Sequence, residues 1–286
     1  MQPIHKEQII RIQAQTGWSH IDLIELWRYR ELIGFLAMRD IKVLYKQSIL
    51  GIVWVVAQPL MTLVVFSTLF GILLGRDGKP TLEGVPYAIS TFCALVPWQY
   101  FARSLTLSGN SLVSNQQLIT KVYFPRMVAP IAGITAPIVD FFVAFTILIG
   151  MMIFYGIMPT WKLVFIPVFI VFSMLTALSI SLWSSAMNAI YRDVRHMLPF
   201  IVQMLMYISP VIYTTENIMA SQPEWVRILY GMNPMAGVIE GFRWCLLGAI
   251  NPQWQVMGAS FVAVMCLLIA GMYYFRRMER IFADVV

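Results

Sequence analysis

The chain has 286 residues, of which 59% are hydrophobic and only 12% are charged. An average soluble domain carries about 25% charged residues, so the composition excludes an ordinary water-soluble protein. The net charge of +6 could suggest a nucleic-acid partner. However, the basic residues are distributed between apolar segments rather than gathered in one patch, and no nucleic-acid partner is expected.

Six long apolar runs divide the chain. They cover residues 49–74, 86–109, 127–156, 162–188, 197–213 and 254–275. Each is about long enough to cross the ~30 Å hydrocarbon core of a membrane as a helix. The runs are continuous rather than alternating, which favours helices over the strands of a barrel. We therefore expect an all-α integral membrane protein with six transmembrane helices, the third bent or shortened by Pro130 and Pro137.

Basic residues mark one side of the expected membrane domain. Most Lys and Arg residues lie before the first run, between the second and third, between the fourth and fifth, or after the last. Because positively charged loops stay in the cytoplasm, this pattern predicts a multi-pass protein with both termini cytoplasmic. The expected organisation is a cytoplasmic N-terminal segment over residues 1–48, a transmembrane domain over 49–275 and a cytoplasmic tail over 276–286.

Residues 22–47 have the pattern of an amphipathic helix with a possible bend at Gly34. The apolar face would carry Leu26, Ile33, Ala37, Ile41 and Leu44. The basic face would carry Arg28, Arg39, Lys42 and Lys46. Such a helix is expected to lie in the membrane interface, either as a plain anchor or with its basic side near lipid phosphates or a cytoplasmic partner.

The connection between the fifth and sixth runs contains two short helical pieces, at residues 225–230 and 235–248. Neither piece is long enough to span a membrane. A pair of broken re-entrant helices over about 224–248, entering from the outer face, fits this pattern, and a cap lying flat on the outer surface is the alternative. Candidates for an outer gate are Asn233, Pro234, Glu240 and Arg243.

The motifs of common enzyme chemistry are missing from the sequence. There is no phosphate-binding loop, no HExxH pair and no Ser-His-Asp pattern. The three cysteines, Cys93, Cys245 and Cys266, are scattered without metal-ligand spacing. We therefore expect no enzyme activity, no metal and no cofactor in this chain, so an energy source would have to be another protein.

Asp140 is the one acidic residue deep inside an apolar run. Intramembrane charges are usually paired or functional, and Arg103 in the second run is a possible partner. Both structural pairing and a role in transport remain open. Aromatic residues near the ends of the runs suggest an interfacial belt, although some could line a conduit. Candidate lining pairs are Trp54 with Gln58 and Gln203 with Tyr207.

Four sequence blocks show a resemblance to a known family. The first is RDIKVLYKQSILGIVW at residues 39–54 followed by QPL at 58–60; the second is KVYFPR at 121–126; the third is YRDVRH at 191–196 with SPVIY at 209–213; the fourth is NPM at 233–235 with EGFR at 240–243 and LG at 247–248. With these blocks in this order, the chain resembles the membrane permease subunit of the ABC exporters that move O-antigens, capsules and teichoic acids.

The resemblance implies a homodimer in the bacterial inner membrane, working with two copies of a separate ATPase that binds ATP and Mg²⁺. It implies a polysaccharide substrate carried on a polyprenyl diphosphate lipid, in contact with membrane lipids. Residues implied for coupling to the ATPase are Lys121, Tyr123, Arg126, Arg192 and Arg195, for which simple membrane anchoring is the alternative. Residues implied for contact with the lipid diphosphate are Arg28, Arg39, Lys42 and Lys46.

One position departs from the family pattern. The family often has an arginine just before the tyrosine of the first block, where this chain has Leu44. Other readings of the whole chain are a permease exporting a drug or another lipid, a membrane enzyme acting on lipid-linked sugars, and a structural assembly protein.

Overall fold

The computed structural model describes residues 23–46, 51–66, 68–69, 86–158, 160–215, 222–248 and 252–285. The side chains of residues 23, 46, 51, 52, 66 and 280–285 fall outside this description. Within the described ranges the chain forms helices and no strand. Residues 70–85, between the first and second predicted spans, and residues 216–221, before the first outer helical piece, lie outside the described residues.

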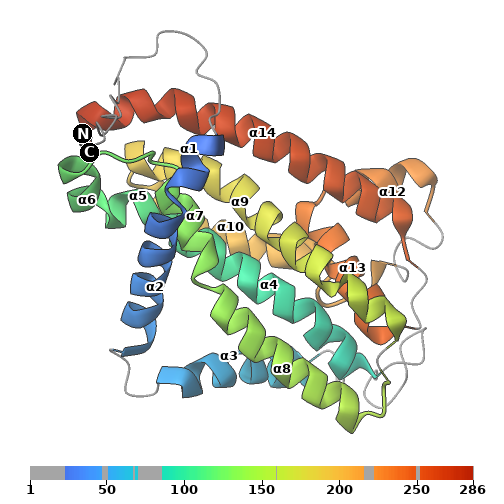
Figure 1. Cartoon of the computed structure of the whole chain (residues 1–286). Helices are drawn as coiled ribbons and strands as arrows, with labels where there is room; N and C mark the ends of the chain where they lie inside the picture. The colour runs from blue at the N-terminus through green and yellow to red at the C-terminus, as the bar shows by residue number, and fades with distance from the viewer. Residues whose placement is uncertain are drawn as a thin grey trace, which may run out of the picture.

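The helices, in chain order, are α1 (Leu23–Arg28), α2 (Arg30–Lys46), α3 (Gly51–Phe66), α4 (Tyr87–Gly109), α5 (Ser111–Ser114), α6 (Gln116–Lys121), α7 (Val128–Thr135), α8 (Ile138–Phe154), the 3-10 helix η2 (Trp161–Phe165), α9 (Ile166–Ile190), α10 (Val194–Ile208), α12 (Glu224–Gly231), α13 (Pro234–Leu247) and α14 (Trp254–Val285). Helices α4, α8, α9 and α14 run alongside one another as a bundle (Figure 1). Helix α9 is central, since it packs against both α14 and α4.

Among the described residues, three helical stretches are long and apolar enough to cross a membrane. They are Val128–Phe154, Trp161–Ile190 and Trp254–Glu279, with mean hydropathies of 2.3, 2.5 and 2.1. Helix α4, in the second predicted span, has 23 residues. The apolar helices of the first and fifth predicted spans are shorter, with 16 residues in α3 and 15 in α10. The prediction of a helical membrane protein is therefore confirmed, and the number of six crossings stays a prediction.

The third predicted span is interrupted where proline requires it. Helices α7 and α8 are separated at Ala136 and Pro137, because Pro137 has no N–H to donate to the preceding turn. Helix α4 donates two hydrogen bonds to carbonyls of α7, from the Tyr100 hydroxyl to Ile134 O at 2.9 Å and from the Ser108 hydroxyl to Pro130 O at 2.8 Å. Pro130 itself lies in the first turn of α7 and does not break it.

Helices α4 and α7 approach closely because Gly133 faces α4. A Cβ atom at this position would lie 2.7 Å from the Ser108 Cα. Helices in lipid gain little from the hydrophobic effect, so small residues that bring backbones together are a main source of their packing energy. Ser104 on α4 and Ser173 and Ser181 on α9 are small residues that are also buried.

The N-terminal helix differs in detail from its prediction. The helix is interrupted at Tyr29, between α1 and α2, and α2 is helical through Gly34. A bend at Gly34 stays a prediction. Figure 1 shows α2 crossing the direction of the bundle helices, and it packs on α7. Leu36 and Ala37 are its most buried residues, and Leu36 was absent from the predicted apolar face. Its placement in a membrane interface stays a prediction.

Candidate functional site

A cavity of about 540 Å³ lies between four helices. Each helix contributes residues at helical spacing: Val55, Gln58, Pro59 and Thr62 from α3; Gln99, Ala102, Arg103 and Thr106 from α4; Pro137, Asp140, Phe141 and Ala144 from α8 and the turn before it; and Pro199, Val202 and Met206 from α10. The aromatic residues Trp98 and Tyr100 of α4 also line the cavity. The volume is within the usual 300–1,000 Å³ range of small-ligand sites.

The predicted intramembrane ion pair lies in this cavity. Arg103 Nε is 2.9 Å from Asp140 Oδ2, and the two side chains retain 32% and 14% exposure. Asp140 occupies the first turn of α8, where the positive end of the helix dipole favours a carboxylate. Tyr45, near the end of α2, donates its hydroxyl hydrogen bond to Asp140 Oδ1. Asp140 thus joins α2, α4 and α8, and Tyr45 is a partner that the sequence alone did not reveal.

The four predicted conduit residues lie on the outside of the single chain. Trp54 is 60% exposed and Tyr207 is 49% exposed, and Gln58 and Gln203 are exposed as well. Gln58 also lines the cavity. Helix α10 is strongly one-sided, since Leu198 is the one buried residue among its side chains.

Charged groups connect α1 and the segment before α7 to the C-terminal half of α14, at one end of the bundle. Arg126 Nη1 donates to the backbone oxygen of Glu279 at 2.6 Å, and the backbone N–H of Arg126 donates to a Glu279 carboxylate oxygen at 3.2 Å. Arg276 forms ion pairs with Glu25 at 3.6 Å and with Glu279 at 3.5 Å. Arg126, predicted to contact an ATPase, is therefore also a link between α14 and the segment before α7.

The other predicted coupling residues are exposed around this end. Lys121, Arg192 and Arg195 are all exposed, and Tyr123 is 71% exposed. Partial burial and then the neighbouring carboxylates of Glu25 and Glu279 raise the pKa of Tyr123. The phenol therefore remains neutral at physiological pH.

The predicted diphosphate contacts are dispersed on α1 and α2. Arg28 and Lys42 are exposed. Arg39 is half-buried and pairs with the adjacent Asp40 at 2.7 Å, which offsets part of its charge. Lys46 ends α2, and its side chain lies outside the described residues.

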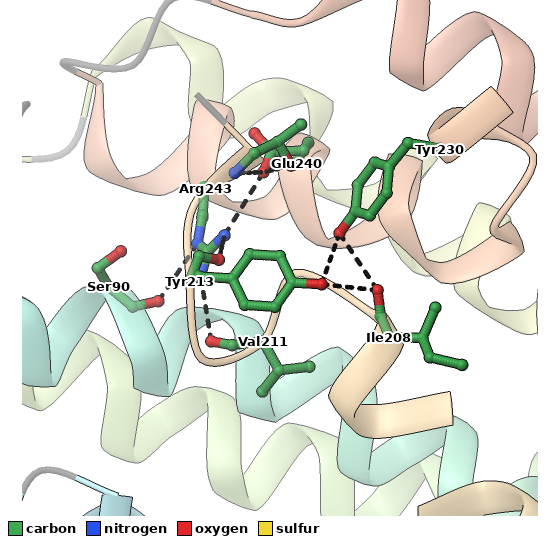
Figure 2. A network of polar contacts seen from close by, with 8 residues as sticks. Ser90, Ile208, Val211, Tyr213, Tyr230, Glu240 and Arg243 are labelled. Atoms are coloured by element: carbon green, nitrogen blue, oxygen red, sulfur yellow. Dashed lines mark hydrogen bonds and ion pairs between the residues drawn. The ribbon is translucent and has the colours of Figure 1, made fainter. Parts of the chain in front are cut away.

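Arg243 and Glu240 form a buried ion pair at 3.4 Å on α13, with side-chain exposures of 1% and 4%. Figure 2 shows the Arg243 guanidinium surrounded by backbone oxygens from other segments. It donates to Ser90 O at 3.4 Å, Tyr213 O at 3.1 Å and Val211 O at 3.2 Å. These bonds fasten α4 and the 209–215 segment to α13, so both residues are interior anchors rather than an exposed rim.

Three further contacts complete this network. The Thr215 hydroxyl donates to Glu240 Oε1 at 2.6 Å. The Tyr213 hydroxyl donates to Ile208 O at 2.7 Å, at the end of α10, and the Tyr230 hydroxyl on α12 lies 3.1 Å from that of Tyr213 (Figure 2). The outer helical pieces and the end of α10 therefore form one hydrogen-bonded unit.

The break between α12 and α13 is built by Asn233 and Pro234, as the sequence predicted. The Asn233 side chain accepts from the Met235 N–H at 3.0 Å and caps α13, while Pro234 occupies the first turn. The Ser260 hydroxyl of α14 donates to Asn233 O at 3.1 Å and Pro234 O at 2.9 Å. Asn233 Nδ2 donates to the Ser209 hydroxyl at 3.0 Å. A gating role for these residues stays a prediction.

A helical bundle with membrane-length apolar stretches is typical of an integral membrane protein. The sequence pattern of the ABC-2 type transporter family matches residues 31–247, and the chain belongs to this family. The resemblance drawn from the four sequence blocks is thereby confirmed.

The chain is similar over nearly its whole length to curated relatives. It is 26% identical over 258 residues to the O-antigen export system permease protein RfbA of Klebsiella pneumoniae, which covers 90% of this chain and 95% of the relative. It is 25% identical over 264 residues to the RfbA permease of Myxococcus xanthus, covering 92% and 98% of the two chains.

Proposed function

We propose that this chain is the membrane subunit of an ATP-driven exporter that moves a lipid-linked polysaccharide, such as an O-antigen on polyprenyl diphosphate, across the bacterial inner membrane. The observation that carries the proposal is the full-length match to O-antigen export permeases, which leaves no large part of either chain unaccounted for. The chain would cross the membrane six times with both termini in the cytoplasm.

The working unit in this proposal is a homodimer bound to two copies of a separate ATPase. The conduit would lie between the subunits along α3 and α10, whose exposed faces carry Trp54, Gln58, Gln203 and Tyr207. The one-sided burial of α10 supports this assignment, because its polar and aromatic side chains need an occupant other than its own subunit.

Nucleotide-driven motion would enter at the end of the bundle that carries Lys121, Tyr123, Arg192 and Arg195. These side chains are exposed, so they are available to a partner. The contacts of Arg126 with α14 would transmit a movement of this end to the rest of the bundle. Closure of the two ATPases would then tilt the spans that follow, as a rigid-body transition of packed helices.

The lipid diphosphate would approach α1 and α2. Of the four predicted contact residues, Arg28 and Lys42 are exposed and would make charge-assisted contacts to its phosphates, together with Arg39 and Lys46. Replacing Arg28 and Lys42 by glutamate would then reduce export more than membrane insertion. Equal loss of both would show that the two residues serve folding instead.

The Asn233 to Arg243 region would form the outer gate. The hydrogen-bonded unit of α12, α13 and the end of α10 supports this, because movement of the conduit helix α10 would be transmitted to the outer helices through Tyr213 and Tyr230.

A permease for a drug or for another lipid is the alternative function. A strain lacking this chain separates the two. Loss of surface polysaccharide with lipid-linked glycan accumulating inside the cell is expected, and normal surface polysaccharide with raised drug susceptibility would favour the alternative. Isolation of the chain from native membranes together with an ATPase would test the partnership.

A further inference from the structure

The cavity between α3, α4, α8 and α10 contains polar groups without hydrogen-bond partners in the described part of the chain. They are the side-chain amides of Gln58 and Gln99 and the two terminal nitrogens of Arg103. Gln99 and Arg103 are four residues apart and share one face of α4, while Gln58 comes from α3.

Three other polar side chains of the cavity have partners. The Thr62 hydroxyl donates to Gln58 O at 2.8 Å, and the Thr106 hydroxyl donates to Ala102 O at 2.9 Å. Asp140 is held by Arg103 and Tyr45. Gln58 is exposed and Gln99 and Arg103 are partly exposed, so their unpartnered donors and acceptors are available to a polar occupant of the cavity.

The charge balance of the cavity favours a neutral occupant. The Arg103 cation is offset by the Asp140 carboxylate, and a phosphate placed on Arg103 would also face that carboxylate. Each amide both donates and accepts, and the guanidinium donates, which matches the hydroxyl groups of a sugar. The remaining walls are mostly apolar, which suits the C–H faces of a sugar ring, while Trp98 and Tyr100 line the cavity but are themselves buried.

We propose that this cavity is a sugar-binding recess beside the conduit, in which Gln58, Gln99 and Arg103 hold a unit of the glycan as the chain advances. The proposal rests on the proposed function. It adds a site distinct from the diphosphate contacts on α1 and α2. The recess shares helices α3 and α10 with the proposed conduit, so a glycan along these helices passes beside it.

The test uses light-activated crosslinking in cells that produce their own polysaccharide. The photoreactive residue p-benzoylphenylalanine replaces one residue at a time: Met206 in the recess, Trp54 on the proposed conduit face, or Val168, which is 60% exposed on α9 and lies outside the cavity. After irradiation, the permease is purified and glycan attached to it is detected by carbohydrate staining and by mass spectrometry.

The expected result is attached glycan at positions 206 and 54 and none at 168. In a Gln58→Leu/Gln99→Leu background, attachment at position 206 should fall by about tenfold, because two hydrogen bonds are lost, while the amount of permease stays the same. The matched control Gln117→Leu, exposed on α6 and outside the cavity, should leave attachment at 206 unchanged.

Several outcomes would overturn the recess. Attachment at 54 but not at 206 would overturn it and leave the proposed function standing, whereas no attachment at either position would count against both. Attachment at 206 that persists in the double leucine variant would show that the amides do not recognise the glycan. A polyprenyl lipid without sugar at 206 would show that the cavity takes the carrier lipid instead.

Discussion

Replacing Arg243 by methionine is predicted to destabilise the protein strongly. The guanidinium is 1% exposed, pairs with Glu240 at 3.4 Å and donates to three backbone oxygens from α4 and the 209–215 segment. Removing one member of a buried pair leaves the other charge unpaired, which costs about 3–5 kcal/mol. For a chain of this size, that loss corresponds to a fall in apparent Tm on the order of 10 °C.

The measurement is thermal unfolding of the detergent-purified variants, followed by loss of the monodisperse species. Arg192→Met is the matched control, since Arg192 is exposed and the same side-chain change should move the Tm by no more than about 1–2 °C. Adding Glu240→Gln to Arg243→Met should restore part of the lost stability, because the buried carboxylate charge is then removed. An Arg243→Met protein as stable as the wild type would refute this account of the network.

Two other contacts between helices give predictions: the Arg103–Asp140 pair and the approach of Gly133 to α4. Arg103→Met and Asp140→Asn should each lower the free energy of unfolding by about 1–3 kcal/mol. The double variant should lose less than the sum of the two, which a double-mutant cycle of Tm values will show. Additive losses would mean that the pair is not coupled. If Asp140 is purely structural, Asp140→Asn that still folds should export polysaccharide normally, and a folded but inactive variant would give it a role in transport. Gly133→Ala should lower the free energy of unfolding by about 1–3 kcal/mol, because its Cβ would meet the Ser108 backbone at 2.7 Å. Gly34→Ala, where the space around the Cβ is open, should be neutral or stabilising. Equal expression and Tm for the two alanine variants would contradict the close packing of α4 and α7.

Local chemistry explains which structural features the sequence could predict. The break near Pro137 follows from the missing N–H of proline, and the start of α13 follows from Asn233 before Pro234. The pairing of Arg103 with Asp140 follows from the high cost of an isolated charge in lipid and from the antiparallel order of neighbouring spans. Each of these depends on a residue and its immediate surroundings.

Contacts between distant segments could not be predicted in the same way. Tyr45 and Asp140 are 95 positions apart, and Arg126 and Glu279 are 153 apart, so neither pairing leaves a periodic signal. The buried role of Arg243 depends on backbone oxygens, which every residue has and which no sequence pattern marks.

The break at Tyr29 shows a similar limit for local rules. The helix continues through Gly34, because a glycine lowers helix stability by only about 1 kcal/mol and packing of the neighbouring Leu36 and Ala37 outweighs that loss.

The most direct test is transport in vesicles that contain the purified chain and its ATPase partner. A labelled polysaccharide on polyprenyl diphosphate is supplied on the side where ATP is added, and its arrival in the vesicle interior is measured by protection from a glycan-degrading enzyme. We predict protected polysaccharide only when the chain, the ATPase and ATP are all present. Protected polysaccharide without this chain, or none with all three components, would contradict its assignment as the export conduit.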